Sequence, residues 1–153
     1  MATNANGSGG DLRSTLAELK RAKSELDDAD DSLSQRIVLA EKSLAKLKLG
    51  VDISVPLDCP AEWVSRYLAF GKHGRDWRLL IEEGPAGGDP EDWSTKALSD
   101  TDRETRAKAF EKLPDLLEAG LRQMRSSIER RRQLIAQADA LLSVIASETD
   151  EES

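Results

Sequence analysis

The sequence predicts an α+β protein: a long antiparallel coiled-coil helical hairpin with a small three-stranded antiparallel β-meander inserted between its two helices. Two long segments repeat apolar residues every seven positions, which is the pattern of a coiled-coil seam. Between them the apolar period falls to two, which is typical of strands covered on one face. We expect a disordered tail (1–10), one domain (11–148, comprising helix 11–49, β insert 51–98 and helix 100–147 kinked near Pro114) and an acidic tail (149–153).

The first predicted helix carries the clearest repeat. Leucine recurs every seven residues at Leu12, Leu19, Leu26 and Leu33, and a second set lies midway at Leu16, Lys23, Asp30, Ile37 and Leu44. This spacing puts both sets on one face of a helix, where they form a seam about five heptads long. Gly50 marks the expected end of the helix because glycine readily adopts the conformation that terminates helices.

The β insert contains a hairpin signal. We predict strands 66–72 and 75–83 around a two-residue turn, His73-Gly74, because glycine supplies the positive φ that such turns require. This register sets Phe70 opposite Trp77. The face that must be covered consists of Leu68, Phe70, Trp77, Leu79 and Ile81. Residues 93–98 form the third strand, and Pro56 limits residues 51–55 to an edge strand at most.

The second predicted helix repeats apolar residues at heptad spacing from Phe110 to Ile145. Pro114 interrupts this stripe and should kink or split the helix, because proline removes one backbone hydrogen bond. Gly120 weakens the same stretch by roughly 1 kcal/mol relative to alanine. We expect residues 101–120 to fold back onto the sheet.

Charge suggests how the two helices pair. In one antiparallel register, Lys23 would face Arg131, which is a like-charge contact. In the neighbouring register Asp30 faces Arg131 as a structural register pair, and the acidic segment 25–31 lies beside Arg130, Arg131 and Arg132. We prefer the second register. A domain-swapped dimer would make the same contacts between chains.

Composition limits the classes of function. The net charge is −7, which argues against a general nucleic-acid binder and against adsorption to anionic membranes. No apolar run approaches the ~20 residues that a membrane-spanning helix needs. A single cysteine excludes an internal disulfide and, with no signal-peptide pattern at the start, suggests a cytoplasmic protein.

Few residues are candidates for chemistry. Cys59 and His73 are the only thiol and the only imidazole, and neither belongs to a metal-ligand or triad spacing. We therefore predict no catalytic residue, no cofactor, no metal and no enzyme activity. Trp63, Tyr67 and Trp93 form the candidate partner surface, although aromatic residues on a small sheet more often form its core.

The order of long helix, β-hairpins and long helix resembles the prefoldin family, whose coiled-coil arms emerge from a β platform. The resemblance covers nearly the whole chain, but no residue motif carries it. It implies ATP-independent holding of unfolded chains by the arm tips. The function we predict is a non-enzymatic protein–protein interaction or assembly protein that self-associates or binds a protein partner. The alternatives are the prefoldin-like holdase and a small-molecule or enzymatic site under the β insert.

Overall fold

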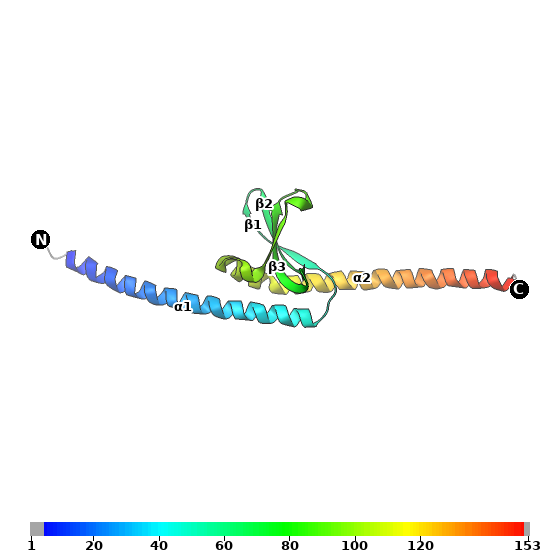
Figure 1. Cartoon of the computed structure of the whole chain (residues 1–153), viewed down its shortest axis with the longest axis horizontal. Coiled ribbons are helices and arrows are strands. Elements are labelled where there is room, and N and C mark those ends of the chain that lie inside the picture. The colour runs from blue at the N-terminus through cyan, green and yellow to red at the C-terminus, as the bar shows by residue number, and fades with distance from the viewer. Residues whose placement is uncertain (1–4, 152–153) are drawn as a thin grey trace.

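The computed structural model describes residues 5–151 and is α+β: two long helices with an antiparallel four-stranded sheet between them in the sequence (Figure 1). The elements are α1 (Ala5–Lys46), β1 (Ile53–Ala61), β2 (Val64–His73), β3 (Asp76–Pro85), β4 (Ser94–Ala97) and α2 (Arg103–Glu151). Short 3-10 helices, η1 (Pro90–Asp92) and η2 (Leu98–Asp100), flank β4.

The sheet is a simple meander with the strand order β1-β2-β3-β4. The prediction of three strands was wrong because β1 continues past Pro56 as far as Ala61. Proline is tolerated there because β1 is an edge strand. The β1–β2 pairing is irregular after Pro56, with register shifts before and after Asp58.

The central hairpin has the predicted covered face but a different register. His73 pairs with Asp76, so the turn residues are Gly74 and Arg75, and Phe70 lies opposite Leu79 rather than Trp77. The φ of Gly74 is 69°, whereas the φ of Arg75 is not positive. A positive φ at the first turn residue alone is the pattern of a type II′ turn. The observed register differs from the predicted one by two residues, so every side chain stays on the predicted face of the sheet. The rings of Phe70 and Trp77 still pack, with centroids 5.8 Å apart.

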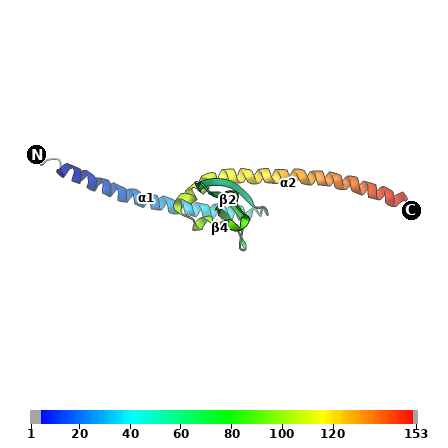
Figure 2. The ribbon, with the colours of Figure 1, turned by 90° about the horizontal axis from the view of Figure 1, so that it is seen from above.

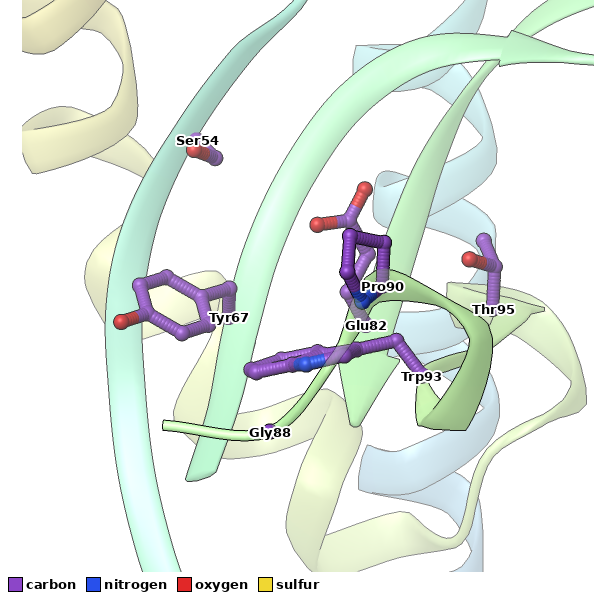
Figure 3. A pocket seen from close by; sticks show the side chains of 7 residues that line it. All are labelled: Ser54, Tyr67, Glu82, Gly88, Pro90, Trp93 and Thr95. Carbon is purple, nitrogen blue, oxygen red and sulfur yellow. The ribbon is translucent and has the colours of Figure 1, made fainter. Parts of the chain in front are cut away.

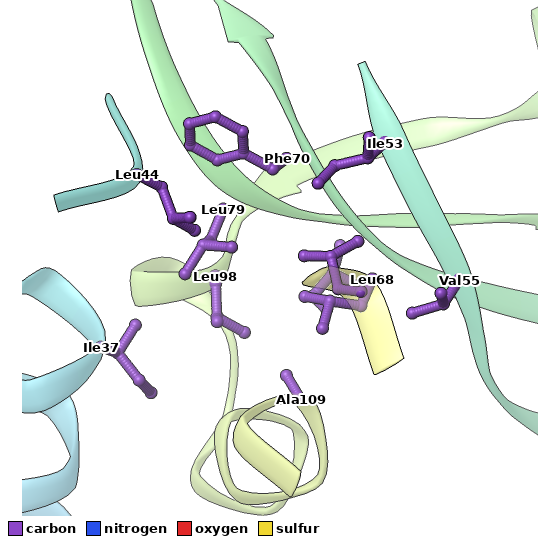
Figure 4. Packing of buried hydrophobic residues seen from close by; sticks show 11 residues of the cluster. Ile37, Leu44, Ile53, Val55, Leu68, Phe70, Leu79, Leu98 and Ala109 are labelled. Carbon is purple, nitrogen blue, oxygen red and sulfur yellow. The ribbon is translucent and has the colours of Figure 1, made fainter. Parts of the chain in front are cut away.

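Both helices cover the same face of the sheet (Figure 4). The core joins Ile37 and Leu44 of α1, Ala109 and Leu116 of α2, η2 residue Leu98, and the inward side chains of three strands, Ile53, Val55, Leu68, Phe70, Leu79 and Ile81. Residues 101–120 therefore do pack on the sheet, as expected. We call the sheet and the helix segments packed against it the head.

The two helices run side by side in the same direction, so the predicted antiparallel hairpin is wrong within one chain. At the start of α2, Arg103 Nη1 lies 2.5 Å from Asp27 Oδ1 of α1. Further along α2, Gly120 packs against Ile53, which follows soon after the end of α1. A hairpin needs α2 to begin beside the end of α1, but the sheet returns the chain to the level of Asp27.

The rest of each helix projects from the head, and the two projections point in opposite directions (Figures 1 and 2). We call residues 5–26 the N-terminal arm and residues 121–151 the C-terminal arm. Helix replaces the predicted tails at residues 5–10 and 149–151, while residues 1–4 and 152–153 lie outside the described part. α2 also runs without interruption through the exposed Pro114.

Candidate functional site

The N-terminal arm exposes the seam that its sequence predicts. The side chains of Leu12, Leu16, Leu19 and Leu26 are each more than half exposed. The same helical face continues into the head, where Ile37 and Leu44 are buried against the sheet. One apolar stripe is thus covered in the head and uncovered on the arm.

The C-terminal arm has the corresponding property. Its exposed apolar side chains are Leu121, Ile128, Leu134, Ile135, Leu141, Leu142, Val144 and Ile145. Most of them are about half exposed or more, and four follow heptad spacing from Leu121 to Leu142. Exposed apolar surface of this extent is uncommon on a monomer and typically marks an interaction site.

Charge divides each arm region into two blocks of opposite sign. On α1, residues 11–23 carry four basic and two acidic side chains, and residues 25–31 carry five acidic and no basic ones. On α2, residues 121–133 carry five arginines and one glutamate, and residues 134–151 carry four acidic and no basic side chains. The blocks nearer the head are therefore acidic on α1 and basic on α2.

The predicted register pair is not formed within the chain. Asp30 Oδ2 lies 3.3 Å from Arg103 Nη1, and Arg131 Nη1 donates to the backbone oxygen of Ser127 at 3.3 Å. Arg103 also holds the pKa of Asp27 below its usual value through a hydrogen bond to its carboxylate. The arginine beside the acidic segment is thus Arg103 rather than Arg131.

Of the three predicted partner-surface residues, two lie together. The rings of Tyr67 and Trp93 have centroids 5.6 Å apart and form adjoining walls of a hollow on the face of the sheet that the helices leave open. Trp63 is 75% exposed and does not line this hollow.

The hollow is a cavity of about 520 Å³ (Figure 3). It is lined by Ser54, Tyr67, Glu82, Gly88, Pro90, Trp93 and Thr95. Tyr67, Glu82 and Thr95 are paired in one row across β2, β3 and β4, so their side chains share a face. The ring of Trp93 lies on Gly84, where a Cβ atom would collide with it. The absence of a side chain at Gly84 therefore lets the indole ring lie directly against the backbone of β3.

Glu82 is the functional candidate that sequence reasoning missed. It is partly buried, and its carboxylate has no hydrogen bond or ion pair with any residue in the described range. No lining residue is basic. The strand pattern places residues 67 and 82 on one face of the hairpin, but it does not distinguish Glu82 from an ordinary solvent-facing side chain.

A second polar cluster fastens α2 to the sheet. Arg66 donates to both oxygens of Asp58, from Nε at 2.6 Å and from Nη2 at 2.5 Å. Its Nη1 donates to Thr105 Oγ1 at 2.9 Å, and Lys108 Nζ lies 3.2 Å from Asp58 Oδ2. The Arg66 hydrogen bonds, assisted by Lys108, hold the pKa of Asp58 below its usual value. Arg66 and Thr105 also line a hollow of about 360 Å³, but their polar groups are paired with one another and with Asp58.

Cys59 and His73, the thiol and the imidazole that the sequence offers, lie near opposite ends of β2. Cys59 is exposed, with Ser65 Oγ 3.9 Å from its sulfur, and His73 is exposed at the hairpin end. Residues 5–151 contain no cluster of three potential metal-ligating side chains. None of the helices in that range has the length and apolar character to cross a membrane. The chain matches no protein-family model, no curated protein and no solved structure.

Proposed function

We propose that the protein is a non-enzymatic assembly protein that forms a dimer, in which each N-terminal arm pairs in antiparallel fashion with the C-terminal arm of the other copy. The observation that carries this proposal is the pair of exposed heptad stripes on arms that leave the head in opposite directions. Heptad spacing is the pattern by which one helix buries its apolar stripe against another.

The directions of the arms suit a two-fold axis. Rotating a second copy by 180° across the long axis brings its C-terminal arm to the side of the first copy's N-terminal arm, and the two helices then run antiparallel. The arms extend about 33 Å and about 46 Å at 1.5 Å per residue, enough for three heptads of contact. One such dimer covers all four arms.

Charge favours this pairing as well. When the arms run antiparallel, the acidic segment 25–31 lies near the other copy's arginine-rich segment 121–133, and the basic segment 11–23 lies near the acidic segment 134–151. Arg103 already forms ion pairs with Asp27 and Asp30. The other carboxylates of the acidic segment, which can face the arginines of the other copy, are Glu25, Asp28 and Asp31. Complementary blocks fix orientation more than they add affinity.

Pairing between like arms would have a different outcome. Contacts between two N-terminal arms at one end and two C-terminal arms at the other would link copies into an open chain, because the two interfaces lie at opposite ends of each molecule. Reciprocal pairing closes after two copies.

Disulfide trapping tests the pairing directly. In a Cys59→Ser background, Leu19→Cys chains are mixed with chains carrying Ile128→Cys, Ile135→Cys or Leu142→Cys, which are one heptad apart. We expect mixed disulfides under mild oxidation. The yield should be highest for Leu142→Cys, because this register sets Asp30 against Arg131. The Ile135 register sets Lys23 against Arg131, and the Ile128 register puts residues 13–23 beside Arg130, Arg131 and Arg132.

The matched control is Arg21→Cys, which lies on the same arm but off the stripe and should give little mixed disulfide. Sedimentation velocity of the unmodified chain should show a dimer. A monomer at tens of micromolar, or a disulfide between two Leu19→Cys chains as the main product, would refute reciprocal pairing.

The holdase suggested by the prefoldin resemblance would use the same exposed stripes. It requires them to stay uncovered, whereas the assembly protein covers them. If the chain is monomeric and suppresses aggregation of a heat-unfolded client, the holdase becomes the better proposal.

A further inference from the structure

We propose that the cavity on the open face of the sheet is a binding site for an alkylammonium group, such as the head of choline or a methylated lysine side chain. The site consists of Tyr67, Glu82 and Trp93 (Figure 3). It lies on the head and is independent of the arm pairing proposed above.

Two aromatic rings provide the first part of the site. Tyr67 and Trp93 are inclined at 52° with centroids 5.6 Å apart, so they form adjoining walls and do not stack in full contact. One side of the Trp93 ring is occupied by Gly84, which holds the indole in place. Aromatic faces attract alkylated cations, and Trp is the most effective of the three aromatic side chains.

An unpaired carboxylate provides the second part. Glu82 lines the same cavity, is partly shielded from solvent, and has no basic partner in the described chain. Its strand neighbours on this face are Tyr67 and Thr95, which bring no charge that would neutralise it. A cation in the cavity would satisfy this carboxylate.

The surroundings point to the same sign of ligand. The loop that closes one side of the cavity carries Asp89, Glu91 and Asp92. Arg66 and Lys96 line a different hollow, beside Asp102 and Thr105. Lys72 and His73 line a second hollow that Glu82 also borders, but they form no ion pair with Glu82 and do not line this cavity. At about 520 Å³ the cavity lies within the size range of small-molecule sites.

The test compares a cation with its uncharged shape analogue. Choline and 3,3-dimethylbutan-1-ol are titrated into the full-length ¹⁵N-labelled protein, and the Trp93 indole N–H shift is followed by NMR. We expect saturable shifts with choline and at least tenfold weaker binding of the neutral alcohol. Nα-acetyl-Nε-trimethyl-lysine amide serves as a third probe. Tighter binding of this compound than of choline would identify a protein-borne ligand, and the reverse a free one.

Variants separate the site from general effects. Glu82→Gln preserves size and should weaken choline binding about tenfold, while Trp63→Leu should leave it unchanged because Trp63 lies outside the cavity. Trp93→Leu removes the indole signal, so binding by this variant is followed through the backbone amides of Glu82 and Gly84. It should be abolished, with the rest of the amide spectrum confirming the fold. Equal affinity for choline and the alcohol, unchanged binding by Glu82→Gln, or no shift up to 10 mM choline would overturn the proposal.

Discussion

Asp58 joins three elements of the head through one carboxylate. It accepts two hydrogen bonds from Arg66 on β2 and lies near Lys108 on α2, and Arg66 reaches Thr105 on α2. The carboxylate and the guanidinium are mostly buried, with 20% and 14% of their side chains exposed. Hydrogen bonds between charged groups in such a setting are stronger than those between neutral groups.

We predict that Asp58→Asn lowers the free energy of unfolding by about 1–3 kcal/mol, because it leaves the Arg66 guanidinium without its charged partner. The pKa of Asp58 is depressed in the folded state, so its ionised form stabilises the protein above the unfolded pKa of about 3.9. That contribution is lost as pH falls through the lower folded pKa.

Urea unfolding between pH 7 and pH 2.5 measures both effects. The unmodified protein should lose stability below about pH 4 more steeply than Asp58→Asn. Asp92→Asn is the control, since this exposed carboxylate forms no ion pair within the described residues. A parallel acid profile for the two Asn variants would contradict the assignment.

At the scale of elements, Gly120 sets the distance between α2 and β1. A Cβ at this position would lie 3.0 Å from Ile53 Cδ1 and 3.2 Å from its Cγ2. The sequence identifies Gly120 only as a weak point in a helix. In the structure it is the buried point where the helix meets the edge strand.

We predict that Gly120→Leu lowers the free energy of unfolding by about 1–3 kcal/mol, the usual cost of overpacking, despite the better helix propensity of leucine. Gly10→Leu is the matched control. Gly10 is also a helical glycine, but no atom lies within 4 Å of its added Cβ. Urea unfolding at pH 7 measures the free energy of unfolding of both variants. Equal stability would show that the contact between Gly120 and Ile53 is not tight.

Periodicity predicted the elements better than their partners. A seven-residue repeat identifies a helix with one apolar face, but it is the same whether that face packs on a sheet, on the other helix or on a second chain. Along α1 the repeat is one continuous stripe, yet Leu44 packs in the head and Leu19 is exposed. Sequence alone therefore could not separate the arm from the head.

The sheet and the cavity were also only partly predictable from the sequence. Alternation predicted the covered face of the hairpin, because a slip of two residues preserves it, but the turn could be placed at His73-Gly74 or at Gly74-Arg75. The pairing of Tyr67 with Trp93 could be suspected from the cluster of aromatic residues. Glu82 could not, since a polar residue on the uncovered face normally indicates only contact with solvent.

At the scale of the whole molecule, most of the exposed large apolar side chains lie on the two arms, which also carry opposite charge blocks. If each N-terminal arm pairs with the C-terminal arm of the other copy, every dimer contains two equivalent interfaces. Each interface then combines one N-terminal and one C-terminal arm.

We predict that two assembly-defective variants restore each other. Leu19→Asp/Leu26→Asp damages the N-terminal arm, and Ile135→Asp/Leu142→Asp damages the C-terminal arm. In either variant alone both interfaces contain a damaged arm, so each should be monomeric. Losing two buried leucines or isoleucines costs roughly 3–6 kcal/mol per interface. In a mixed dimer, one interface combines the two damaged arms and the other combines two intact ones.

Sedimentation velocity of each variant and of their equimolar mixture provides the measurement. The mixture should contain a 1:1 dimer, weaker than that of the unmodified protein because it has one working interface. Ser14→Asp/Ser24→Asp adds the same charge away from the stripe and should still dimerise. If the arms instead paired like with like, the variant damaged in its N-terminal arm would dimerise by itself through its intact C-terminal arm. A dimer of that variant alone would therefore reject reciprocal pairing while leaving the apolar stripes as the contact surface.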